Sequence, residues 1–319
     1  MGRHVAGSCP ELDRLVDDAC AEIGREIASL AVPRLAGVVL GGGYGRGEGG
    51  ARRLEDGTMV LSNDLDFFAV TEDGVPEAES IAAIGEALKP VAEKWTKQLG
   101  VDVDFAVKTP WRLKHDESRL MVQELIRGYL DVAGKKGAEL FARIEKISAA
   151  KLPWTEAARL LMNRGMGLLL ALEAFRSGEF IARNINKCVL GAGDALLVLR
   201  RAYGWRASER AAALAATGDD GLYSAAVEWK FRPQAAPVCD WEKARTRWLE
   251  AYGELRRGGH SGGKSVRSAM RWLVRRHSLG DLATFGLVPE ERVLRRVAAA
   301  IRARRHASPG LRGDWQVFN

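Results

Sequence analysis

The sequence lacks any long hydrophobic run. Although 47% of its 319 residues are hydrophobic, no apolar stretch reaches the roughly 18 residues that a membrane-spanning helix requires. The opening Met1-Gly2-Arg3-His4 is not followed by the apolar core of a secretory signal. We therefore expect a cytoplasmic protein with no membrane partner.

Cysteine and histidine are scarce and are not arranged as metal ligands. None of the four cysteines stands in a CxxC pair, and the five histidines show no ligand spacing. These absences argue against a zinc site and a disulfide framework, and no Ser/His/Asp arrangement for nucleophilic catalysis stands out. The cysteines are expected to be reduced thiols: Cys9, Cys20, Cys188 and Cys239.

Charge is distributed unevenly along the chain. The net charge is +7, but residues 1 to 150 carry −6 and residues 151 to 319 carry +13. An acidic half joined to a basic half suits a polyanionic substrate held with metal ions, and the basic half is a possible nucleic-acid surface. The alternative is that the arginines only decorate solvated helix faces.

The order of predicted elements gives a fold class of α/β plus all-α. In the first half, helices alternate with four short strands, which predicts a small mixed sheet in a domain of residues 1–150. The strands are expected at residues 37–40, 64–71, 101–107 and 129–133. The main helices are expected at 10–31, 76–98, 116–127 and 138–147, with a loop or hairpin at 53–62.

After Pro153 only helices are predicted, which indicates a helical bundle domain over residues 151–319. They are expected at residues 154–176, 183–203, 206–216, 219–231, 240–257, 264–277 and 289–305. Glycines in the first two of these helices would let them pack closely.

The most informative stretch runs from residue 40 to residue 66. A glycine-rich turn, residues 41–47, follows an apolar run, and Asp64 and Asp66 stand at i and i+2 just before the next strand. Such a pair points to one side of a strand and can share divalent cations. The glycines let a phosphate chain approach the backbone.

A second carboxylate pair, Asp102 and Asp104, begins the third strand. If that strand lies beside residues 64–71, one of its carboxylates joins Asp64 and Asp66. Three carboxylates on adjacent strands are what two-metal phosphoryl chemistry needs. Solvated strand residues explain either pair alone, but they explain both pairs beside a glycine turn less well.

Gly42-Gly43, Asp64-x-Asp66 and a later strand aspartate together resemble the polymerase-β-like nucleotidyltransferase superfamily. The glycine turn is especially similar to that of the uridylyltransferases that modify PII proteins. The helical second half is similar to that of small-substrate nucleotidyltransferases. Two departures stand out: Gly43 and Asp64 are 21 positions apart, longer than usual, and Asn63 stands where the family often has serine or glycine.

The resemblance implies a role for each matching residue. Gly42 and Gly43 would hold the phosphates of an NTP, with ATP as the first candidate. Asp64 and Asp66 would bind two Mg²⁺ ions.

Asp104 fits the position of the third carboxylate best, and Asp102 is the reserve choice. Arg46 would either pair with Glu48 or touch phosphate.

Lys187 is the expected phosphate contact from the second domain, since a lysine there often reaches the triphosphate in this superfamily. It shares a helical stripe with Gly191 and Asp194. The alternative is an ion pair, Lys187–Asp194 or Arg164–Asp194, that fixes helix packing.

Gly258, Gly263, Lys264 and Ser265 satisfy the GxxxxGK[ST] pattern, but a predicted helix precedes it where a P-loop requires a strand. A basic stripe follows at helical spacing and could follow a nucleic-acid backbone. A solvated face is the simpler interpretation.

The sequence thus predicts an Mg-dependent nucleotidyltransferase that moves an NMP from an NTP to an acceptor hydroxyl. The acceptor, whether a small molecule, a protein or RNA, is left open. The alternative is a catalytically retired nucleotide- or RNA-binding regulatory protein on the same scaffold.

Overall fold

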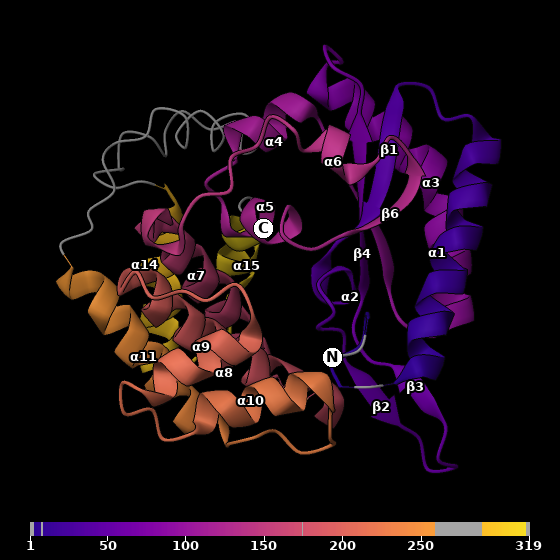
Figure 1. The fold of residues 1–319 in the computed structure, drawn as a ribbon. Helices are drawn as coiled ribbons and strands as arrows, with labels where there is room; N and C mark the ends of the chain where they lie inside the picture. Colours follow the sequence, from indigo (N-terminus) through magenta and orange to yellow (C-terminus); the bar gives the residue numbers. More distant parts are fainter. Residues whose placement is uncertain (1–2, 8, 174, 259–288, 317–319) are drawn as a thin grey trace. The chain divides into compact units, whose positions relative to one another are not determined.

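The computed structural model describes residues 3–7, 9–173, 175–258 and 289–316. Residue contacts divide the chain into two compact units. The first consists of Met1–Ser148 with Lys230–Pro233, and the second of Ala149–Trp229 with Gln234–Asn319. The described residues form a mixed α/β structure in which helices predominate and the sheets are small (Figure 1).

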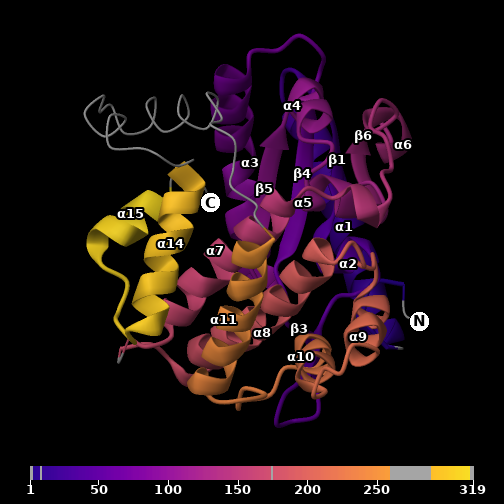
Figure 2. The same ribbon diagram turned by 90° about the vertical axis from the view of Figure 1, so that its left-hand side faces the viewer.

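A four-stranded sheet of order β5-β4-β1-β6 forms the centre of the first unit (Figure 2). Strand β1 is antiparallel to both β4 and β6, whereas β4 and β5 are parallel. The predicted mixed sheet and its four strands are therefore present. Their bounds are β1 Leu35–Leu40, β4 Leu65–Thr71, β5 Val103–Lys108 and β6 Leu130–Gly134.

Helices α1 (Pro10–Leu30) and α3 (Glu77–Leu99) pack on one face of this sheet. Helix α1 buries an apolar stripe at helical spacing that begins at Leu12 and Val16. Helix α3 ends at Gly100, whose φ of +69° is the left-handed conformation that terminates many helices.

The opposite face carries a second apolar cluster, to which Val39, Phe68 and Val70 contribute from the strands. Here the predicted helix at 116–127 is present only over residues 120–125. The chain instead forms α4 (Pro110–His115) and α5 (Leu120–Leu125). Extended Arg119 breaks the helix, and its side chain reaches back to Asp116.

The predicted helix at 138–147 is also wrong beyond its first turn, because α6 spans only Gly137–Leu140. Turn hydrogen bonds continue as far as the Ile144 N–H, which donates to the Phe141 carbonyl, and beyond this point the backbone bonds to side chains. Gln123 donates to the Glu145 carbonyl and accepts from the Ile147 N–H, while Arg127 donates to the Ile147 carbonyl.

Residues 51–61 form a separate hairpin of strands β2 (Ala51–Arg53) and β3 (Met59–Leu61), in agreement with the predicted excursion. The hairpin pairs its strands with one another rather than with the main sheet.

The described part of the second unit is helical apart from its loops. Helix α7 packs against α8, α11 and α14, and glycines allow close approach. A Cβ on Gly165 would lie 2.6 Å from Val297, and one on Gly191 would lie 2.3 Å from Arg164. The helices are α7 Trp154–Leu170, α8 Gly178–Leu199, α9 Ala207–Ala215, most of α10 Leu222–Phe231, α11 Trp241–Arg257, α14 Pro289–Arg302 and α15 Pro309–Gln316, with a 3₁₀ turn at Ala149–Lys151.

The helix predicted at 154–176 ends at Leu170, so that prediction is six residues too long. Helix α8 begins five residues early because the Ser177 side chain accepts a hydrogen bond from the Phe180 N–H and caps it. Helix α15 was not predicted. It is held to α7 by the Trp315 indole, which donates to Asn163 at 3.0 Å.

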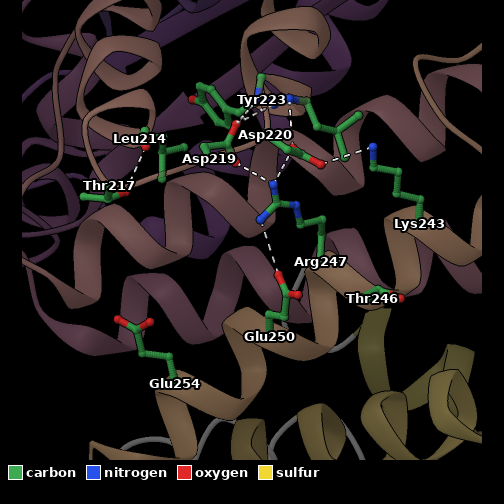
Figure 3. Close-up of polar contacts among 12 residues, drawn as sticks. Leu214, Thr217, Asp219, Asp220, Tyr223, Lys243, Thr246, Arg247, Glu250 and Glu254 are labelled. Carbon is green, nitrogen blue, oxygen red and sulfur yellow. Dashed lines mark hydrogen bonds and ion pairs between the residues drawn. The ribbon is translucent and has the colours of Figure 1, made fainter.

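The loop between α9 and α10 is fastened to α11 by charge (Figure 3). Asp219 and Asp220 accept backbone hydrogen bonds at the start of α10, and both are paired with Arg247. Lys243 also pairs with Asp220. Burial raises the pKa of Asp220, but the hydrogen bonds from Arg247 and Lys243 outweigh it and lower the pKa to about 2.

Among the helices that the structure describes, none is long and apolar enough to cross a membrane.

Candidate functional site

The glycine turn is anchored on strand β4. Strand β1 ends at Leu40, and a four-residue helix, α2 (Gly42–Gly45), follows Gly41. The Gly41 N–H donates to the Asp66 carbonyl at 2.8 Å. Since Gly42 and Gly43 begin a helix, their N–H groups have no acceptor within it. They are therefore suited to a phosphate oxygen.

Gly42 lies directly against the Asp66 carboxylate. Its φ is +61°, and a Cβ placed on it would be 2.3 Å from Asp66 Oδ2. Only a residue without a side chain fits here, both for its conformation and for its closeness to the carboxylate. The structure thus brings together the two halves of the 40–66 stretch.

Strands β4 and β5 place two predicted carboxylates opposite one another. Asp66 is the register partner of Asp104, and both side chains are exposed. Because side chains alternate along a strand, Asp66 shares a face with Phe68, and Asp104 shares it with Ala106. Asp64 precedes β4 immediately, and the Asp102 carbonyl accepts from the Leu65 N–H at 2.8 Å.

The negative charges of this group act on one another. Burial, followed by the charges of Asp102 and Asp64, raises the pKa of Asp104. Both neighbouring carboxylates are thus close enough to disfavour ionisation of the Asp104 carboxyl, and a cation would relieve that repulsion.

Carboxylate oxygens are the donors that Mg²⁺ prefers, so the chemistry of this set fits the predicted metal. Within the described residues, however, no three His, Cys, Asp or Glu side chains form a group ready to hold a metal ion. The assignment of Asp64, Asp66 and Asp104 as Mg²⁺ ligands therefore stays a prediction.

The long spacing between Gly43 and Asp64 is taken up by the hairpin, whose base is closed by Tyr44. The buried Tyr44 hydroxyl donates to the Gly50 carbonyl at 2.7 Å and accepts from the N–H groups of Ser62 and Asn63. Burial raises the pKa of Tyr44 to about 12, so the phenol keeps its proton. The hairpin therefore begins and ends at the Tyr44 hydroxyl. The extra residues between Gly43 and Asp64 lie in the hairpin, and the glycine turn stays beside Asp66.

Asn63, the other departure from the family pattern, completes this closure. Its side-chain oxygen accepts from the Gly50 N–H at 2.6 Å. Gly49 packs closely against the Tyr44 ring, because a Cβ placed on Gly49 would lie 2.0 Å from Cδ1 of Tyr44. These structural roles of Tyr44, Gly49 and Asn63 were not predicted. The signal was available in Tyr44, a large side chain within a run of glycines.

Arg46 is held by two carboxylates. Its guanidinium lies 3.7 Å from Glu48 Oε2 and 3.1 Å from Glu124 Oε2, and its side chain is only 15% exposed. Of the two roles predicted for Arg46, pairing with Glu48 is therefore the one that the structure displays.

Lys187 lies on α8 in the second unit, and its role as a phosphate contact stays a prediction. Asp194, on the same helix, accepts a hydrogen bond from the Tyr223 hydroxyl at 2.5 Å and pairs with Arg210 at 3.0 Å. Arg210 was not among its predicted partners. Arg164 is near enough for the Asp194 charge to act on it.

The glycine-lysine pattern from Gly258 to Ser265 and the basic stripe after it lie outside the described residues, except for Gly258.

Comparison with known proteins gives little. No protein-family model matches the chain, and no curated protein matches it. Among solved structures, a spectinomycin adenyltransferase, AAD(9) from Enterococcus faecialis with ATP and spectinomycin, aligns with a TM-score of 0.44 and 12% identity. The alignment covers 75% of this chain and 99% of that one. A likeness of this degree carries no argument about function.

Proposed function

We propose that the protein is a nucleotidyltransferase that moves an NMP from an NTP, with ATP as the first candidate, to an acceptor hydroxyl. One observation carries the proposal. Asp66 and Asp104 stand opposite one another on parallel strands, and Gly42 of the glycine turn lies against the Asp66 carboxylate. A backbone suited to phosphate and a set of carboxylates suited to Mg²⁺ thus lie side by side.

In this proposal, each group has a defined task. The N–H groups of Gly42 and Gly43 bind phosphate oxygens, and Asp64, Asp66 and Asp104 hold Mg²⁺. Bound Mg²⁺ would offset the charge that develops on the phosphate oxygens and orient the triphosphate.

Asp104 is also the proposed base. The Asp104 carboxylate stands opposite Asp66 on the neighbouring strand and can accept a proton from a hydroxyl held there. The acceptor hydroxyl gives its proton to Asp104 and its oxygen attacks the α-phosphorus. The bond from that phosphorus to the bridging oxygen breaks, and pyrophosphate leaves.

Calorimetry with Mg²⁺ and each NTP, followed by an assay for pyrophosphate release with cell extract as the source of acceptors, tests this function. Binding together with release supports the transferase. Binding without release supports the regulatory alternative, and retention of RNA without NTP binding would favour an RNA-binding protein. Mass spectrometry of the extract after incubation with labelled NTP identifies the class of acceptor.

A further inference from the structure

Residues 3–7 form a strap that pairs with Gly49, two residues beyond the glycine turn. The Gly49 N–H donates to the His4 carbonyl at 2.9 Å, and the Ala6 N–H donates to the Gly49 carbonyl at 2.8 Å. The same strap is fastened to α1, because the Asp13 carboxylate accepts from the N–H groups of Arg3, His4 and Val5. The strap therefore connects a long helix to the turn that lies on Asp66.

The His4 ring makes the second link between α1 and the turn. It is 3% exposed, with Nδ1 at 3.2 Å from the Tyr44 carbonyl oxygen and Nε2 at 3.0 Å from Asp17 Oδ1. A carbonyl oxygen only accepts hydrogen bonds, and so does an ionised carboxylate. Arg3 pairs with the other oxygen of Asp17 at 2.8 Å, which favours its ionised form.

Both ring nitrogens thus face acceptors. A neutral imidazole has a single N–H, so one of these contacts would set a nitrogen lone pair against an oxygen lone pair. Only the doubly protonated ring satisfies both contacts.

We propose that His4 is a positioning residue for the nucleotide site, a doubly protonated imidazole ring that holds the glycine turn through the Tyr44 carbonyl. Its charge is balanced by Asp17. The residue touches neither the predicted metal ligands nor the N–H groups of Gly42 and Gly43, so it acts through the turn.

Loss of a ring proton removes one of the two hydrogen bonds and loosens the turn. Among the described residues, the charged groups that act on the ring are Asp13 and Asp17 of α1, and Arg3 of the strap pairs with Asp17. The hydrogen bond from His4 to the Tyr44 carbonyl concerns the fold alone. Its effect on nucleotide binding rests on the proposed function.

Long-range ¹H–¹⁵N NMR of the full chain tests the protonation state directly. Because both ring nitrogens face acceptors, we expect the nitrogen shifts of His4 in the folded protein to show both nitrogens protonated. A single protonated nitrogen in the folded protein would overturn the proposal. This measurement requires no variant and no nucleotide.

Amide hydrogen exchange of residues 42–49 tests the hold on the turn. His4→Gln should speed amide exchange in the turn roughly ten- to a hundredfold, because the variant loses one charge-assisted hydrogen bond. Asp17→Asn should also speed it, although Asp17 does not touch the turn. His306→Gln, at an exposed histidine of the second unit, serves as the control. Unchanged exchange in both His4→Gln and Asp17→Asn would contradict the proposal.

Calorimetry with Mg·ATP then separates this proposal from the proposed function. We expect His4→Gln to weaken binding by about tenfold, the cost of one lost hydrogen bond to the turn, whereas His306→Gln should bind as the native protein does. Native affinity in His4→Gln would refute the positioning role. If the native protein binds no Mg·ATP while both ring nitrogens are protonated and the exchange results hold, the proposed function fails and the hold of His4 on the turn stands.

Discussion

Replacing Gly42 by alanine tests the contact between the glycine turn and Asp66, one of the proposed metal ligands. The new Cβ meets two obstacles, a φ of +61° and the Asp66 carboxylate at 2.3 Å. Gly100 provides a matched control. Its φ is +69°, and nothing lies within 4 Å of a Cβ placed there.

The two variants share the conformational cost, which is about 1–2 kcal/mol for alanine in the left-handed region. We expect Gly100→Ala to lose that amount of unfolding free energy. In Gly42→Ala the Asp66 side chain must also turn away, and overpacking of this kind adds about 1–3 kcal/mol. Because Asp66 is exposed, its carboxylate can move, which places the extra cost at the lower end.

Urea unfolding measures the stability of both variants, and calorimetry with Mg·ATP measures their affinity. Gly42→Ala should bind at least about tenfold more weakly, since it displaces a proposed ligand and a proposed phosphate contact. Gly100→Ala should bind as the native protein does. Equal affinities in the two variants would show that the Gly42–Asp66 contact plays no part in nucleotide binding.

Three further predictions concern the closure of the hairpin, an ion-pair cluster and the proposed base. Tyr44→Phe should lose only about 1–2 kcal/mol of unfolding free energy, because the Ser62 N–H keeps the Gly50 carbonyl as a second acceptor at 3.2 Å. A loss above that range, measured by urea unfolding, would show that the hydroxyl does more than close the hairpin. Asp220→Asn should cost less than about 1 kcal/mol at neutral pH, since Asp220 is 46% exposed. The pKa of Asp220 in the folded protein, about 2, lies below the ordinary value. The difference in unfolding free energy between the native protein and Asp220→Asn should therefore be constant above about pH 4 and decrease as the pH falls toward 2. Asp102→Asn should lower the raised pKa of Asp104 in the metal-free protein, because it removes one of the charges that raise this pKa, and NMR titration of the Asp104 carboxyl measures the change. An unchanged pKa would show that Asp102 does not act on Asp104.

Much of the first unit could be predicted because its signals are local. The apolar run after Asp66 predicted strand β4, the alternating pattern of residues 101–107 predicted strand β5, and the adjacency of those strands was expected from the chemistry of their aspartates. The parallel register sets Asp66 beside Asp104, and the choice of Asp104 over Asp102 as the third carboxylate stays a prediction.

What could not be predicted depends on single side chains that reach distant backbone. The Tyr44 hydroxyl closes a hairpin 18 residues away in sequence, and Gln123 takes the hydrogen bonds of Glu145 and Ile147 and so prevents a helix there. His4 lies 40 positions from Tyr44, and no periodic pattern links the two. Such contacts arise from the folded chain and leave no trace in the spacing of residue types.

The most direct test of the central claim is transfer by the Asp64→Asn, Asp66→Asn double variant. The label from α-phosphate-labelled NTP, incubated with Mg²⁺ and cell extract, is followed together with pyrophosphate. Asp73→Asn, which removes an exposed carboxylate just beyond β4, is the control. We predict that the native protein and Asp73→Asn transfer label while the folded double variant transfers none. Transfer that persists in the double variant would contradict the assignment of these carboxylates.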